Sequence, residues 1–220
     1  MADGPRSPDT PGWRVRVVPN LYPAFERQEV VVHSPRHVRT FAELTDDEVA
    51  AVAATWHARR DVARVEGFPY LHALINEGRA AGSSLPHSHS QLVWLREAPP
   101  AVTAEHTDAV PELLAESHLE IAELGGMVAV AHRAGRLPYE TLIGGEPFDL
   151  ATGLRLLRDV VRRLRALEGA VPWNAWLHDG SSPHLELVPR LAVQAGIELG
   201  GGIAVNTVSP EDAAAALRSV

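Results

Sequence analysis

The chain has 220 residues, of which 45% are hydrophobic and 22% charged, and its net charge is −8, which is typical of a globular protein. It has no apolar run of about 18 residues, which argues against a membrane partner, and its acidic balance argues against nucleic-acid binding. It has no cysteine, which excludes disulfides and thiolate metal sites and predicts a cytoplasmic location.

The first half of the chain predicts strands on either side of one helix. Residues 1–12 are rich in Pro, Asp and Gly, which predicts a disordered tail. Thr45 and Glu48 form a capping box in front of apolar residues at helical spacing, which predicts a helix. Apolar runs and alternation predict strands over residues 13–18, 29–33, 70–76 and 88–95.

The second half repeats this order of elements. Apolar residues recur every three or four positions from Leu150 to Leu164, which predicts a long amphipathic helix, and Ser209 caps a helix near the C-terminus. Strands are predicted over residues 127–132, 139–143, 173–178 and 184–188. The repeat indicates an internal duplication and an α+β fold with antiparallel sheets and packed helices. The expected parts are a half over residues 13–97, a linker with a helix over 98–125 and a half over 126–220.

The motif at residues 87–91, His-Ser-His-Ser-Gln, carries the strongest chemical signal. Alternate side chains of a strand share a face, so His87, His89 and Gln91 are expected to point the same way. The preceding residues 76–86 are mostly small or polar, and such a segment brings amides and hydroxyls close to an anion. An imidazole beside a phosphate-sized cradle indicates nucleophilic attack on phosphorus. The alternative is a chance pair of surface histidines, because the chain has 11 of them.

These residues resemble the galactose-1-phosphate uridylyltransferase family, a branch of the histidine-triad superfamily. The resemblance covers residues 13–218, including residues 17–23 before the motif and, less closely, residues 189–211 after it. It implies two tandem histidine-triad-like halves, with the active site in the first and a degenerate copy in the second. It also implies a homodimer that binds a nucleotide sugar and a sugar 1-phosphate.

The resemblance implies a role for each matching residue. His89 would be the nucleophile, His87 would orient its ring through a backbone carbonyl, and Gln91 would hold a phosphate oxygen. Arg190 would bind substrate or, alternatively, brace the end of its strand. The residues expected to bind nucleotide or phosphate are Asn20, Asn76, Gly82, Ser83 and Ser84. Those expected to bind sugar are Glu198 and Arg190.

Gln91 stands where hydrolases of the superfamily carry a third histidine, which can protonate a leaving group. A carboxamide only forms hydrogen bonds, which favours transfer over hydrolysis. The implied reaction moves a nucleoside monophosphate, UMP in this family, between a nucleotide sugar and a hexose 1-phosphate through a nucleotidyl-histidine, without a cofactor. Two alternatives stay open. One is a phosphorylase or hydrolase acting on ADP-sugars or dinucleoside polyphosphates, and the other is a non-catalytic nucleotide-binding module.

Two sets of residues match metal sites of the family. The first site usually includes a Cys-x-x-Cys segment, and because only His37 and His87 match it here, we expect this site to be lost. The second set has two imidazoles and two carboxylates, which suit structural zinc or iron. An equal alternative for this set is a buried His–Glu hydrogen-bond network. Its members are Glu105, His178, His184 and Glu186.

Overall fold

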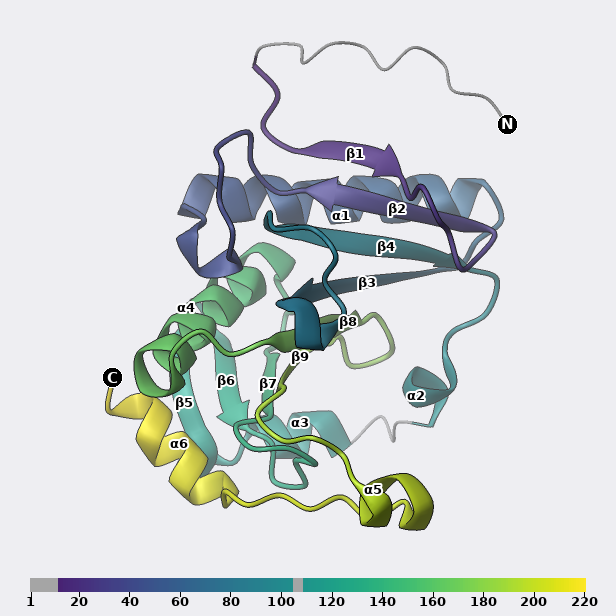
Figure 1. Cartoon of the computed structure of the whole chain (residues 1–220). Helices are drawn as coiled ribbons and strands as arrows, with labels where there is room; N and C mark the ends of the chain where they lie inside the picture. Colours follow the sequence, from purple (N-terminus) through teal and green to yellow (C-terminus); the bar gives the residue numbers. More distant parts are fainter. Residues whose placement is uncertain (1–11, 105–108) are drawn as a thin grey trace.

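The computed structural model describes residues 12–104 and 109–220. Glu105 and the predicted disordered tail, apart from Gly12, therefore lie outside the described residues. Nine strands form one antiparallel sheet in the order β1-β2-β4-β3-β8-β9-β7-β6-β5 (Figure 1). The strands are β1 (Arg16–Pro19), β2 (Arg27–Val32), β3 (Tyr70–Glu77), β4 (His89–Leu95), β5 (Glu120–Leu124), β6 (Met127–Ala131), β7 (Thr141–Gly144), β8 (Trp173–His178) and β9 (His184–Pro189).

The two halves of the chain meet in the middle of this sheet. Strand β3 of the first half pairs with β8 of the second, and Ile75 lies opposite Ala175. Counted outward from the junction, the order is β3-β4-β2-β1 on one side and β8-β9-β7-β6 on the other, with β5 beyond β6. The two orders correspond strand by strand, as an internal duplication predicts. The predicted α+β class with antiparallel strands is confirmed. The pairing of β3 with β8 merges the sheets of the two halves into one.

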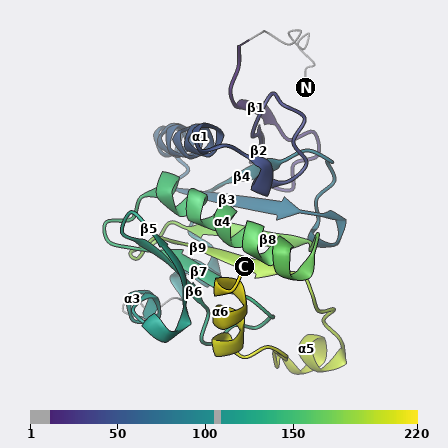
Figure 2. The same ribbon diagram turned by 90° about the vertical axis from the view of Figure 1, so that its left-hand side faces the viewer.

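Three helices cover one face of the sheet, as Figure 2 shows: α1 (Asp46–Val65), α4 (Leu150–Glu168) and α6 (Pro210–Arg218). The predicted capping box of Thr45 and Glu48 begins α1. In the described part of the chain, no helix has both the length and the hydrophobicity that a bilayer span requires. The short helices are α2 (Pro100–Thr103), α3 (Ala109–Leu114) and α5 (Gly196–Gly201), with 3-10 turns η1 (Phe41–Glu43), η2 (Arg79–Ala81) and η3 (Ser117–Leu119).

Strand β5 lies inside the segment 98–125, for which the sequence predicts only a linker with a helix. Helices α2 and α3 supply the helical part, whereas β5 pairs with β6 at the edge of the sheet. Ile121 is the one large buried side chain of β5, since its neighbours along the strand are polar, small or exposed. A single buried residue gives no periodicity, so only the pairing with β6 defines this strand.

A substitution of Trp173 tests how the core packs at the junction between the halves. Its ring lies on the helix side of β8, has 0% exposure, and packs edge-to-face against Phe41 with 6.4 Å between ring centroids. Trp173→Ala is expected to lower the free energy of unfolding in urea by about 3–5 kcal/mol, because it leaves a large cavity. The matched control is Trp176→Ala on the opposite face of β8, where the ring is half-buried and the loss should be clearly smaller. Equal losses would contradict this description of the core.

Candidate active site

Strand β4 presents alternate side chains to the two faces of the sheet. Ser90 accepts a hydrogen bond from Trp56 Nε1 of α1 at 2.9 Å, so it faces the helices. His89 and Gln91 therefore lie on the face turned away from α1. The hydrogen bond from Trp56 thus fixes β4 on its helix side. The side chains of His89 and Gln91 lie on the other side.

The ring of His89 is held by the backbone of its own motif. Its Nδ1 donates to the carbonyl oxygen of His87 at 2.8 Å, and the residue is only 4% exposed. A carbonyl oxygen only accepts hydrogen bonds, so Nδ1 carries the proton and Nε2 carries the lone pair of the neutral ring. Burial lowers the pKa of His89 below its usual value, although the hydrogen bond to His87 opposes the shift. His89 is therefore neutral at neutral pH, which is the nucleophilic form.

A cavity of about 600 Å³ opens beside His89. It is formed by the turn η2 and the residues that follow it, where Gly82 adopts a left-handed conformation with φ of 89°. Gly78 also has a positive φ, and a Cβ atom there would lie 2.9 Å from Cβ of Pro172. Glycine at residue 78 thus lets the turn pack against the start of β8. The cavity brings together the predicted residues Asn76, Gly82, Ser83, Ser84, His87 and His89.

The second half of the chain holds the cavity wall through Asn174. This residue of β8 donates through Nδ2 to Asn76 Oδ1 and to the carbonyl oxygen of Ala81, both at 2.8 Å. Asn76 is thereby oriented, and the turn η2 is tied to the centre of the sheet. No local sequence pattern indicates a role for Asn174. Its contact with Asn76 depends on the pairing of β3 with β8, which places the two residues opposite each other.

Gln91 lies on the same face as His89 and is oriented by a neighbouring strand. Its Oε1 accepts a hydrogen bond from Gln28 Nε2 of β2. The Nε2 group of Gln91 is then the part that can donate to a substrate oxygen. Gln28 in turn accepts from the amide of Ala24 at 3.0 Å, so it also orders the loop between β1 and β2. Gln28 is a second supporting residue that the sequence alone did not indicate.

His33 supports the motif from the helix side of the sheet. It has 0% exposure, and its Nδ1 lies 2.9 Å from the hydroxyl of Ser88. Burial holds the pKa of His33 well below its usual value, with the nearby His89 and His87 as further causes. His33 is therefore neutral, and it fixes the residue between the two histidines of the motif. In the sequence, Ser88 and Ser90 alternate with His87, His89 and Gln91. This alternation is the one local sign that the serines face the other side of the strand and can be bound there.

Gln91 and three further predicted binding residues are not among the residues that line this cavity. Asn20 lies after β1, where its side chain accepts from the amide of Tyr22 at 3.0 Å. Glu198 caps α5 by accepting from the amide of Ala195 at 2.8 Å. Arg190 follows β9, and its amide donates to Pro172. Their predicted roles in binding nucleotide or sugar stay predictions.

His37 and His87 lie together, with 6.0 Å between ring centroids. The Nε2 of His87 is 2.9 Å from the carbonyl oxygen of Arg36, and its Nδ1 is 3.1 Å from that of Ser88. Both ring nitrogens thus face backbone acceptors, and two histidines without cysteine do not make a closed four-ligand zinc site. The residues present do not fit the first metal site of the family.

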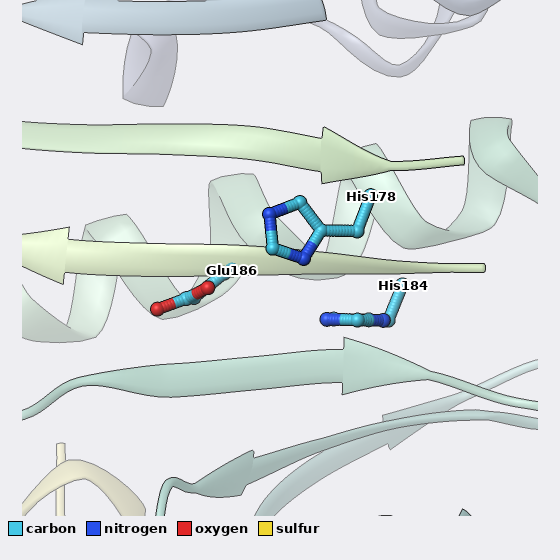
Figure 3. Close-up of side chains that lie close together, drawn as sticks. All are labelled: His178, His184 and Glu186. Carbon is cyan, nitrogen blue, oxygen red and sulfur yellow. The ribbon is translucent and has the colours of Figure 1, made fainter. Parts of the chain in front are cut away.

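The second metal set fits a metal better. His178, His184 and Glu186 are buried and turn toward one another (Figure 3), and their ligand atoms all lie within 4.8 Å. His184 Nδ1 lies 2.9 Å from the carbonyl of Ser182, which leaves Nε2 for coordination. Burial lowers the pKa of His178 to about 4, so the ring is in the neutral, metal-binding form. Arg136 donates to Oε1 of Glu186 at 2.9 Å, so this carboxylate also has a hydrogen-bond partner outside the metal set.

Known proteins are similar to this chain in sequence and in fold. Residues 23–100 match the family model described as the N-terminal domain of galactose-1-phosphate uridyl transferase. An ADP-glucose phosphorylase of Arabidopsis thaliana is 26% identical, over 98% of this chain and 77% of that protein. The chain is therefore similar to proteins of the galactose-1-phosphate uridylyltransferase family. The predicted resemblance is thereby confirmed.

Solved structures of this family agree with the fold. The structure of an ADP-glucose phosphorylase from Arabidopsis thaliana with bound ADP-glucose is 25% identical, with a TM-score of 0.84 over 96% of this chain and 84% of that chain. A uridylyltransferase structure is 21% identical, with a TM-score of 0.85 over 100% of this chain and 92% of that chain. The second likeness shows the fold alone.

The buried His33 makes a pH-dependent contribution to the stability of this protein. Its pKa is lower in the folded chain than in the unfolded chain, so the stabilisation is complete above about pH 6.5 and is lost as the pH falls. His33→Phe removes the titrating group. The slope of unfolding free energy against pH between 6.5 and 5 should then fall by up to about 1.4 kcal/mol per pH unit. Urea unfolding at several pH values measures this, and identical slopes would contradict it.

Proposed function

We propose that this chain is a nucleotidyltransferase that moves a nucleoside monophosphate from a nucleotide sugar to a phosphate acceptor through a nucleotidyl-His89 intermediate. The observation that carries the proposal is the His89 ring itself, which is neutral, held at Nδ1 by the His87 carbonyl, and placed at a cavity lined by small polar residues. Nucleophilic attack requires such an oriented lone pair next to a bound phosphate.

In the first half-reaction, the lone pair of His89 Nε2 attacks the α-phosphorus of the nucleotide sugar. A P–N bond forms, the bridging P–O bond breaks, and its electron pair leaves with the sugar 1-phosphate. The carbonyl of His87 stabilises the positive charge that develops on the ring, because it accepts from Nδ1. Asn76 and Ser84 line the cavity as neutral groups that can donate to the phosphate oxygens, whereas the hydroxyl of Ser83, which also lines it, donates to the carbonyl oxygen of Leu85 at 3.2 Å.

In the second half-reaction, an acceptor phosphate attacks the same phosphorus and the P–N bond breaks. Gln91 offers an amide donor, which cannot act as an acid on the leaving group. The carboxamide of Gln91 also cannot accept a proton from an attacking water, so residue 91 supplies no general base for hydrolysis of the intermediate. This supports transfer to a phosphate acceptor over transfer to water.

Two donors are supported by different comparisons. The ADP-glucose phosphorylase relative supports an ADP-sugar as donor and inorganic phosphate as acceptor. The match to the uridyl transferase family model supports UDP-glucose and a hexose 1-phosphate. We favour ADP-glucose, because that relative aligns over 98% of this chain, whereas the family model matches residues 23–100 only.

Mass spectrometry of the intact protein tests this function. After incubation with ADP-glucose, the protein should gain one AMP on His89, and a larger yield of UMP from UDP-glucose would instead support the uridylyl donor. His89→Gly should abolish the adduct, because no other group supplies the lone pair at that position. His57→Ala on α1 is the control and should keep full adduct formation. A wild-type protein that forms no adduct with either donor would refute the proposal.

We further propose that His178, His184 and Glu186 bind a structural zinc or iron ion, because these residues fit the ligand set and the predicted nucleophile lies elsewhere. Protein dialysed against zinc should retain about one equivalent, and His184→Ala should retain far less. Metal analysis of the two proteins measures this. His118→Ala, which changes an exposed histidine, is the control. Equal zinc contents in wild type and His184→Ala would contradict a metal at this site.

A further inference from the structure

Two arginine side chains line the His89 cavity without any role in the reaction described above. Arg39 follows β2 and precedes η1, and Arg79 is the first residue of η2, so they approach the cavity from different segments. Both are exposed. Neither arginine was singled out by the motif, because both lie outside residues 87–91.

Within residues 12–104 and 109–220, neither Arg39 nor Arg79 has an ion-pair or side-chain hydrogen-bond partner. Other arginines of this half are paired. Arg36 binds Glu48 at 2.6 Å, Arg60 binds Asp179 at 3.0 Å, and Arg59 binds Glu29. Two guanidinium groups without a carboxylate partner give this cavity a local positive charge, which favours an anionic ligand, although the chain as a whole has a net charge of −8.

The cavity wall does not supply this charge itself. Among the described residues that line it, Glu77 is the one with a carboxyl group. That carboxyl group accepts from the hydroxyl of Thr40 and from the amide of Phe41 at 2.7 Å, so it faces η1. Burial raises the pKa of Glu77, which disfavours its charged form. The positive charge of Arg39 and Arg79 is therefore left for a ligand.

The two kinds of donor in the cavity suit two different phosphates. Neutral groups, as on Asn76 and Ser84, suit the α-phosphate, which carries a single charge in a nucleotide sugar. Two guanidinium groups suit a phosphate with two charges, since each forms charge-assisted hydrogen bonds. We propose that Arg39 and Arg79 bind the dianionic phosphate that serves as acceptor, either inorganic phosphate or the phosphate of a sugar 1-phosphate. This inference rests on the proposed function.

The same two arginines serve both half-reactions. In the second one, an oxygen of the bound phosphate attacks the α-phosphorus, a P–O bond forms, and the P–N bond to His89 breaks with its electron pair returning to Nε2. The product is a nucleoside diphosphate from inorganic phosphate, or a nucleotide sugar from a sugar 1-phosphate. In the first half-reaction, Arg39 and Arg79 hold the phosphate that departs and gains a second negative charge.

Discharge of the isolated nucleotidyl-enzyme tests this assignment. The adduct is prepared with excess ADP-glucose and freed of donor, and its loss is followed at increasing concentrations of inorganic phosphate or of glucose 1-phosphate. In Arg39→Gln and in Arg79→Gln, the half-saturating phosphate concentration should rise about tenfold or more, because a charge-assisted contact is lost. Arg133→Gln is the control. Arg133 lies in the second half of the chain, does not line the cavity and is paired with Glu116.

The outcomes separate this inference from the proposed function. No adduct in the wild type with ADP-glucose or UDP-glucose would refute the function itself. A wild-type adduct, together with unchanged phosphate dependence in both glutamine variants, would overturn only the role of Arg39 and Arg79. Lysine variants of both residues retain the charge and should discharge faster than the glutamine variants. Discharge as slow as in the glutamine variants would overturn an electrostatic role. If the glutamine substitutions raise the half-saturating concentration more for one acceptor than for the other, that acceptor is the phosphate that Arg39 and Arg79 bind.

Discussion

The hydrogen bond from His89 Nδ1 to the carbonyl oxygen of His87 is the interaction on which the candidate site depends. It places the proton on Nδ1 and leaves the lone pair on Nε2, so the direction of any attack is set before a substrate binds. A carbonyl two residues earlier in the same segment can provide this contact only if that segment keeps one conformation. The surrounding structure therefore serves largely to hold residues 87–91 in place.

That support comes from both faces of the sheet and from both halves of the chain. On the helix side, Ser88 is bound by the neutral His33 and Ser90 by Trp56. On the cavity side, Asn174 of the second half orients Asn76 and the turn η2. A half that carries no counterpart of the candidate nucleophile thus still contributes to the site, because the pairing of β3 with β8 places it beside the first half.

The second half also shows how the same scaffold can carry different chemistry. When His87-Ser-His89 of the first half is aligned with His184-Leu-Glu186 of the second, Glu186 stands where the first half has His89. Glu186 lies on β9 next to His178 and His184, which is a set of groups suited to a metal rather than to attack on phosphorus.

The sequence by itself determined the elements, their repeated order, the antiparallel class and the motif, because these depend on local periodicity and on residue type. The tertiary structure decided which residues meet. Strand β5 was missed because its pattern is short, and the support from Asn174, Gln28 and His33 was missed because it crosses between distant strands. Glu198 and Arg190 were expected in the binding set from their position along the chain, yet neither lines the cavity. Contacts of this kind depend on strand register, which local sequence patterns do not encode.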